Sequence, residues 1–102
     1  MDNGIWIIDG HACTMYANDR MAEILGTSRA EMLGKASFEY VFESDLPAAK
    51  NLFSQKQQGD SGTFKFQLRR KDGTAVQVEV QGTPMYDSTG KFNGIVGTFK
   101  EV

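Results

Sequence analysis

The chain has 102 residues and a formal net charge of −2, enough for one domain with one modest hydrophobic core. Its Lys and Arg residues are scattered among acidic ones, and we expect the lysines, Lys56 included, to lie on an ordinary solvated surface. This pattern excludes the basic stripe of a nucleic-acid-binding protein, and no apolar run approaches the roughly 20 residues of a membrane-spanning helix.

The single cysteine, Cys13, excludes an internal disulfide and fits a reducing compartment. The first residues lack the basic region of a signal peptide. We therefore expect a cytoplasmic location, whether or not the parent protein is attached to a membrane. Because the chain starts at a predicted strand and stops at the end of one, we expect residues 1–102 to be a single domain of a longer protein.

The first quarter of the chain predicts two short strands followed by a helix. Residues 4–9 form an apolar run that ends in an acid, typical of a strand buried on both faces or nearly so. A short turn leads into a second strand at residues 13–17. Asn18 is typical of a helix N-cap and Gly26 of a helix end, so we predict a helix over residues 19–25.

Two further helices are predicted before the remaining strands. Ser28 and Glu31 have the spacing of a capping box and indicate a short helix. Residues 38–42 are too short and too aromatic to assign. A second helix start, with a proline in its first turn, predicts a longer helix over residues 44–58.

Three strand patterns follow, joined by turns at residues 71–74 and 87–91, where Gly and Asp tolerate positive φ. In each strand apolar residues alternate with polar ones, which predicts an antiparallel sheet with one buried and one wet face. The residues predicted on the buried face are Phe64, Phe66, Leu68, Val76, Val78, Val80, Ile95, Gly97 and Phe99.

Several motifs resemble those of a PAS domain, in the same order and at the same spacing, over essentially the whole chain. They are Asp9 with Asn18, residues 21–26 followed by residues 31–35, residues 42–45, residues 70–74, residues 84–90 and residues 94–97. The chain departs from the family pattern at Ala12, at Thr14 and at the end of the last strand. The resemblance implies an α+β fold with a five-stranded antiparallel sheet in the order 2-1-5-4-3. Short helices and one longer helix would pack on one face, enclosing the site where ligand-binding members hold their ligand.

The resemblance also identifies candidate residues for a ligand cavity. They are Trp6, Ile8, Tyr16, Tyr40, Leu52, Phe53, Phe64, Phe66, Leu68, Val78, Val80, Ile95 and Phe99. The sheet residues among them are all apolar, so a polar contact would have to come from Thr14, Tyr16, Tyr40 or Asn51. Two interpretations stay open: a filled core, or a small apolar pocket for a small or lipid-like ligand. We expect Trp6 to point inward and to leave little room for a flavin-sized molecule.

We predict no cofactor, no metal site and no catalytic residues. Haem-binding members of the family usually take their axial ligand from the long helix, which here has no histidine. Photoactive flavin-binding members carry an Asn-Cys pair on the preceding short helix, and residues 37–42 contain no cysteine. His11 and Cys13 are expected to be a turn residue and a small strand residue, and the single histidine argues against an enzyme.

The resemblance implies a sensory or regulatory module of a signal-transduction protein, with a two-component sensor histidine kinase as the favoured parent. Its partners would be neighbouring domains and a second copy in a homodimer. The signal would leave through Lys100, Glu101 and Val102. The alternative is a ligand-free interaction or dimerisation module of a transcription regulator or another signalling protein. The basic residues 69–71 are expected to be a solvated strand end, or else a contact for a neighbouring domain.

Overall fold

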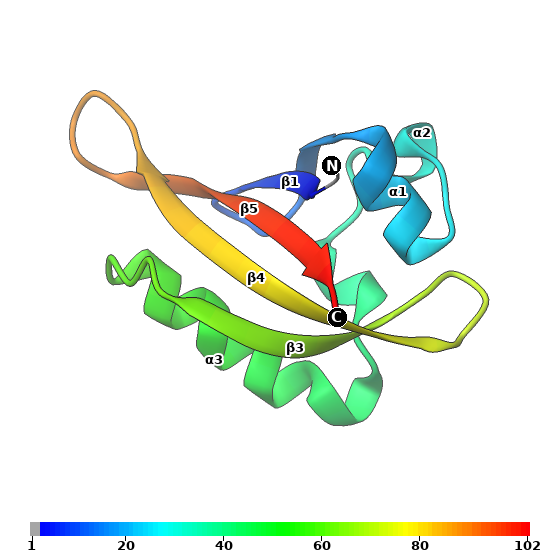
Figure 1. Ribbon diagram of the computed structural model, residues 1–102. Coiled ribbons are helices and arrows are strands. Elements are labelled where there is room, and N and C mark those ends of the chain that lie inside the picture. The colour runs from blue at the N-terminus through cyan, green and yellow to red at the C-terminus, as the bar shows by residue number, and fades with distance from the viewer. Residues whose placement is uncertain (1–2) are drawn as a thin grey trace.

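The computed structural model describes residues 3–102, and its five strands form one antiparallel sheet (Figure 1). The strand order is β2-β1-β5-β4-β3, which confirms the predicted order. The strands are β1 Gly4–Asp9, β2 Thr14–Ala17, β3 Thr63–Arg69, β4 Ala75–Tyr86 and β5 Phe92–Glu101. The first and last strands of the sequence therefore lie side by side at the centre of the sheet.

The helices occupy the stretch between β2 and β3 and leave the other face of the sheet uncovered. In Figure 1, α3 runs along β3 and β4, while α1 and α2 lie beside β1. The helical segments are α1 Asp19–Leu25, α2 Arg29–Met32, the 3-10 turns η1 Ser37–Tyr40 and η2 Glu43–Asp45, and α3 Leu46–Gln57. Within the described residues, none of these helices has the length and apolar character needed to cross a membrane.

Helix α1 has the predicted bounds, and its N-cap also ties it to the sheet. The Asn18 side-chain oxygen accepts hydrogen bonds from the backbone N–H of Met21 and of Ile5, each at 2.9 Å. One side chain thus caps a helix and pairs an N–H of β1. Gly26 ends the helix in the left-handed region, with φ 66°.

The register of the strands places the predicted alternating residues on the face that α1 and α3 cover. Trp6 lies opposite Gly97, and Val80 lies opposite Phe99. The buried core joins this face to side chains of α1 and α2. Ile5, Ile7 and Ile8 are all partly buried, so β1 is less completely buried than the sequence predicted. The unassigned residues 38–42 begin with the 3-10 turn η1, which follows the isolated bridge between Cys13 and Ala36.

Candidate functional site

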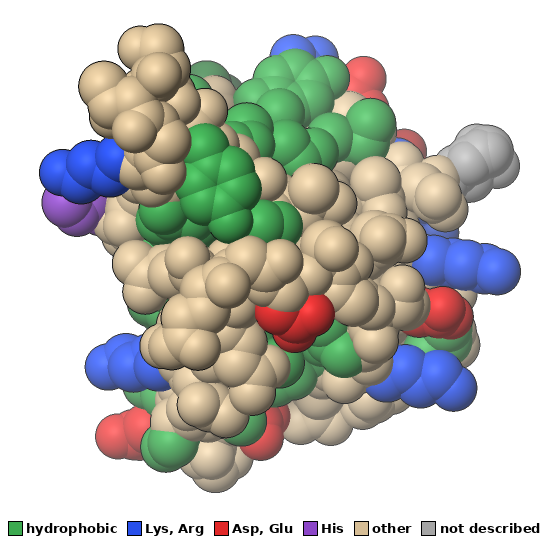
Figure 2. Space-filling model, turned by 90° about the vertical axis from the view of Figure 1, so that its left-hand side faces the viewer, with side chains coloured by type: hydrophobic (Ala, Val, Ile, Leu, Met, Phe, Trp, Pro, Cys, Tyr) green, Lys and Arg blue, Asp and Glu red, His purple; other side chains and the backbone are tan. Residues whose placement is uncertain are grey.

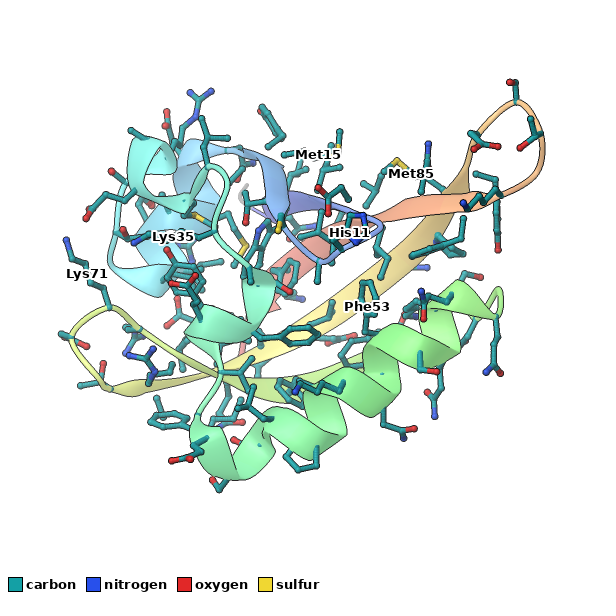
Figure 3. All side chains as sticks on the ribbon, turned by 180° about the vertical axis from the view of Figure 1, so that it is seen from behind. His11, Met15, Lys35, Phe53, Lys71 and Met85 are labelled. Carbon is teal, nitrogen blue, oxygen red and sulfur yellow. The ribbon has the colours of Figure 1, made fainter. Side chains whose placement is uncertain are left out.

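A cavity of about 120 Å³ lies between α3 and the inner face of the sheet. Figure 3 shows Phe53 on α3 directed toward the strands. The wall is formed mainly by apolar side chains of β1, β3, β4, β5, η1 and α3. Its residues are Trp6, Ile8, Ser37, Phe38, Val41, Ala49, Leu52, Phe53, Lys56, Phe64, Phe66, Leu68, Val80, Gly82, Ile95, Gly97 and Phe99.

Most of the cavity candidates from the sequence lie in this wall, and three do not. Val78 is fully buried in the core but does not reach the cavity. Tyr40 packs behind Trp6, and Tyr16 is 40% exposed on the sheet. Of the suggested polar contacts, Asn51 is exposed on α3, and Thr14 is already hydrogen-bonded to Trp6.

Trp6 contributes the largest side chain to the cavity wall. It is 4% exposed, and its Nε1 donates to the Thr14 hydroxyl at 2.9 Å. Its ring meets Tyr40 edge-on at a centroid distance of 5.7 Å and Phe99 at 5.5 Å. These contacts satisfy the one polar atom of the indole and hold the ring in a single orientation. The inward orientation expected from the sequence is therefore present.

A row of aromatic rings continues from the cavity toward the surface. Phe53 meets Phe38 at 6.0 Å and Phe92 at 5.8 Å, and Phe92 meets Tyr86 at 6.5 Å, all in edge-to-face geometry. Such pairs are the favoured arrangement of aromatic quadrupoles. Tyr86 is 48% exposed, so the row runs from η1 and α3 to the β4–β5 hairpin, where its last ring meets solvent.

Lys56 is the one charged residue in the cavity wall, and the expectation that it lies on the solvated surface is wrong. Its side chain is 4% exposed. Its ammonium donates to the carbonyl oxygen of Gly62 at 2.9 Å and lies 5.3 Å from the centre of the Phe64 ring. The missing side chain of Gly82 makes room for it, because a Cβ there would lie 3.1 Å from Lys56 Cε.

The sequence carried a signal for this burial. Ala49, Phe53 and Lys56 follow helical spacing, so the lysine shares the inner face of α3 with two cavity residues. Lysine is almost never fully buried unless it is paired. The general preference of lysine for the surface therefore predicts an exposed Lys56, while the helical periodicity predicts a buried one, and the structure agrees with the periodicity.

At the other end of the sheet, Glu101 joins β5 to two distant elements. Its carboxylate lies 3.3 Å from Arg20 Nη2 of α1 and 3.4 Å from Arg70 Nη2 after β3. Arg70 also donates through Nε to the Ile24 carbonyl oxygen at 3.1 Å. Val102 N–H pairs with the Gln77 carbonyl oxygen at 3.0 Å. The residues proposed as the signal exit are thus held against α1 and β4.

The basic residues 69–71 make contacts within the domain rather than forming a bare solvated end. Arg69 donates to the Glu39 carbonyl oxygen. Lys71 Nζ lies 2.7 Å from the Glu31 carboxylate, and this hydrogen bond lowers the pKa of that carboxyl. The three cations therefore fasten the β3–β4 hairpin to η1, α1 and α2.

The other titratable candidates lie away from the cavity. His11 is exposed in the β1–β2 turn (Figure 3), where Asp9 accepts its backbone N–H at 2.8 Å. Cys13 is half-buried, with its sulfur 3.9 Å from the His11 carbonyl oxygen. Burial raises the pKa of Tyr40, and the neighbouring Glu39 adds to the effect. Among residues 3–102 there is no group of three or more His, Cys, Asp or Glu placed to hold a metal ion.

The sequence of residues 1–102 matches the PAS fold family along its whole length. The chain belongs to the PAS family. This PAS domain is 33% identical, over 72 residues or 69% of its length, to sporulation kinase A of Bacillus subtilis (strain 168). It spans 12% of the length of that kinase.

Solved PAS domains have the same fold. The PAS domain of a Colwellia psychrerythraea protein superposes with a TM-score of 0.87 at 18% identity, covering 98% of this chain and 86% of that chain. The Drosophila melanogaster Cycle PAS-B domain with bound ethylene glycol gives 0.83 at 17% identity, covering 97% and 99%. A PAS domain from a two-component sensor histidine kinase gives 0.78 at 19% identity, covering 98% and 85%. The chain is therefore a PAS sensory domain.

Proposed function

We propose that this PAS domain is the sensory module of a two-component sensor histidine kinase and that its cavity binds a small, mainly apolar ligand. The observation that carries the proposal is the mainly apolar cavity of about 120 Å³ between α3 and the sheet. The similarity to sporulation kinase A supports the kinase context. In this proposal the kinase chemistry belongs to other parts of the parent protein, and the domain works in the cytoplasm.

The size and lining of the cavity limit what it would hold. Pockets for drug-sized ligands and cofactors are typically about 300–1,000 Å³, and an apolar cavity of about 150 Å³ takes up benzene. A cavity of about 120 Å³ suits a single ring or a few branched carbons. We propose that the domain works without haem or a photoactive flavin, because α3 has no histidine and residues 37–42 have no cysteine.

The proposed signal path is the central strand β5. Ile95, Gly97 and Phe99 line the cavity, and Phe99 lies two residues before Glu101, which forms a clamp with Arg20 and Arg70. A ligand that packs against Phe99 in one position of the strand and not in another would change the balance between those positions. The contacts of Glu101 with Arg20 and Arg70 would convert that shift into a movement between β5, α1 and the following neighbour domain.

Toluene tests the proposal through the melting temperature of the domain. A ligand present at ten times its Kd adds about 1.4 kcal/mol of stability, which for a domain of this size raises the melting temperature by about 6–11 °C. Ala49→Leu fills the cavity from α3 and should remove the effect. Ala48→Leu makes the same change on the exposed side of α3 and should keep it. No shift with toluene or other one-ring hydrocarbons, or an equal shift in Ala49→Leu, would contradict a ligand cavity.

A second candidate function, protein interaction or homodimerisation, is supported by apolar side chains on the surface. Figure 2 shows hydrophobic side chains gathered on the face seen there, with charged residues around them. Among the described residues, Met15 is 56% and Tyr16 40% exposed. Sedimentation equilibrium of the parent and of Tyr16→Glu tests this function: a dimer that the substitution dissociates supports it, and a monomer at all concentrations contradicts self-association.

A further inference from the structure

Lys56 carries a buried positive charge, which the packing of the cavity wall by itself does not need. Its side chain is 4% exposed, although a lysine on α3 could extend into solvent as Lys50 does. An ammonium has three N–H donors. The carbonyl oxygen of Gly62 accepts one of them at 2.9 Å. A charge taken out of water is stable only when it is paired and its donors are satisfied.

The nearest carboxylate only partly meets this need. Asp60 Oδ2 lies 4.0 Å from Lys56 Nζ, longer than a charge-assisted hydrogen bond of about 2.7–2.9 Å. The other oxygen, Oδ1, accepts the Gly62 N–H at 2.9 Å, and the Asp60 side chain is half exposed. The face of Phe64 adds a cation–π contact at 5.3 Å. The described contacts of Lys56 therefore leave hydrogen-bonding capacity at the positive charge.

The position of this charge matters because the rest of the wall, apart from Ser37, consists of apolar residues. Lys56 crosses the backbone of β4 at Gly82 and contributes to the same cavity as Ala49, Phe53 and Phe64. Trp6 and Phe99 supply aromatic surface from the central strands. The stem of Lys56 lies in the wall, and its ammonium lies over the ring of Phe64, another wall residue. A mainly apolar cavity of about 120 Å³ with one cation beside its wall suits a molecule with a small apolar body and a single anionic group.

We infer that the ligand of this PAS domain is a small carboxylate with a one-ring or short branched hydrocarbon body, and that Lys56 binds its carboxylate. The inference rests on the proposed function, since it assumes that the cavity is occupied. The inference adds to the proposed function a residue that determines specificity, Lys56, and a class of ligand, the small carboxylates. Lys56 selects the anion over an uncharged molecule of the same shape, and the apolar wall limits the size of the body.

Benzoate and benzamide form a matched pair of probes, because they have nearly the same shape and differ in charge. In isothermal titration calorimetry at low ionic strength, the parent domain should bind benzoate at least about ten times more tightly than benzamide. Lys56→Met keeps the apolar stem of the side chain and should abolish this preference. Lys50→Met removes a lysine from the exposed side of the same helix and should leave it intact.

Asp60→Asn provides a second test that does not depend on removing the buried lysine. The asparagine side-chain oxygen still accepts the Gly62 N–H, while the competing carboxylate disappears. The affinity for benzoate should rise severalfold, and the affinity for benzamide should stay the same. A purely structural role of Lys56 predicts no change in the ratio of the two affinities.

The outcomes separate this inference from the proposed function. Equal affinities of the parent for benzoate and benzamide, or a preference that survives Lys56→Met, would overturn the role of Lys56 and leave the cavity as a site for neutral ligands. If toluene and benzamide bind to the domain and benzoate does not, the role of Lys56 is overturned as well. Binding of none of the three would overturn both the inference and the proposed ligand site.

Discussion

Replacing Trp6 with alanine should both destabilise the domain and enlarge its cavity. The indole is 4% exposed, and a Trp side chain buries on the order of 200 Å². At about 25 cal/mol per Å² this corresponds to roughly 5 kcal/mol, within the upper part of the usual range of about 3–5 kcal/mol for removing a large aromatic side chain from a core. The substitution also leaves the buried Thr14 hydroxyl without its donor.

Thermal melts measure this loss. For a domain of about 100 residues, each 1 kcal/mol corresponds to about 4–8 °C, so Trp6→Ala should melt at least about 12 °C below the parent. Trp6→Phe keeps an aromatic ring and loses the hydrogen bond to Thr14, and it should cost less. It also serves as the folded comparison if the alanine variant is too unstable to purify.

The enlarged cavity gives a second readout. Indole should stabilise Trp6→Ala, because it restores both the ring and an N–H donor for the Thr14 hydroxyl, 2.9 Å from Nε1 in the parent. Indene has the same shape without the N–H and should stabilise the variant less. If Trp6→Ala melts like the parent and no aromatic compound raises its melting temperature, Trp6 is not buried. The register of β1 would then be displaced by one residue, because such a slip turns every side chain to the other face.

Four further substitutions test the structure in other places. Asn18→Ala removes an N-cap and the partner of the Ile5 N–H, so denaturant unfolding should show a loss of about 2–3 kcal/mol; an unchanged midpoint would contradict both bonds. Ala12 has φ 66°, so Ala12→Gly should be neutral or stabilise by up to about 1 kcal/mol in the same assay, and a large loss would exclude strain there. Because burial raises the pKa of Tyr40, its contribution is complete below the unfolded-state pKa of about 10 and is lost as the pH rises through the folded one. Tyr40→Phe should flatten that alkaline decline in urea midpoints, and an identical decline would contradict the shift. Glu101→Gln weakens the contacts to Arg20 and Arg70 and should speed amide hydrogen exchange at the end of β5; unchanged exchange would mean that the clamp does not order this end.

The sequence predicted the sheet well because its physical signals are local. The alternation in β3, β4 and β5 identified the inner face, and Asn18 and Gly26 set the bounds of α1. Strand order came from the family resemblance, since nothing local in the sequence states which strands are neighbours. The double role of Asn18 was not predicted, because its bond to Ile5 joins residues 13 positions apart.

The candidate site was predicted in outline and missed in its details. The apolar wall followed from strand alternation, while Ser37 and Phe38 joined it from a 3-10 turn, and Val41 from the residue after that turn, where the sequence has no periodic signal. Tyr16 was expected near the ligand, but it lies on the exposed side of β2. The burial of Lys56 depends on the empty space over Gly82, a contact between α3 and β4 that only the folded chain reveals.

The coupling of the cavity to β5 is tested most directly by a titration of the ¹⁵N-labelled domain with toluene, followed through amide chemical shifts. We expect shifts at Ile95, Phe99 and Phe53, which line the cavity, and also at Lys100 and Glu101, which are not part of its wall. Ala49→Leu should suppress both sets, and Ala48→Leu should keep both. Shifts confined to the cavity, with Lys100 and Glu101 unmoved at saturation, would contradict a signal path through the last strand.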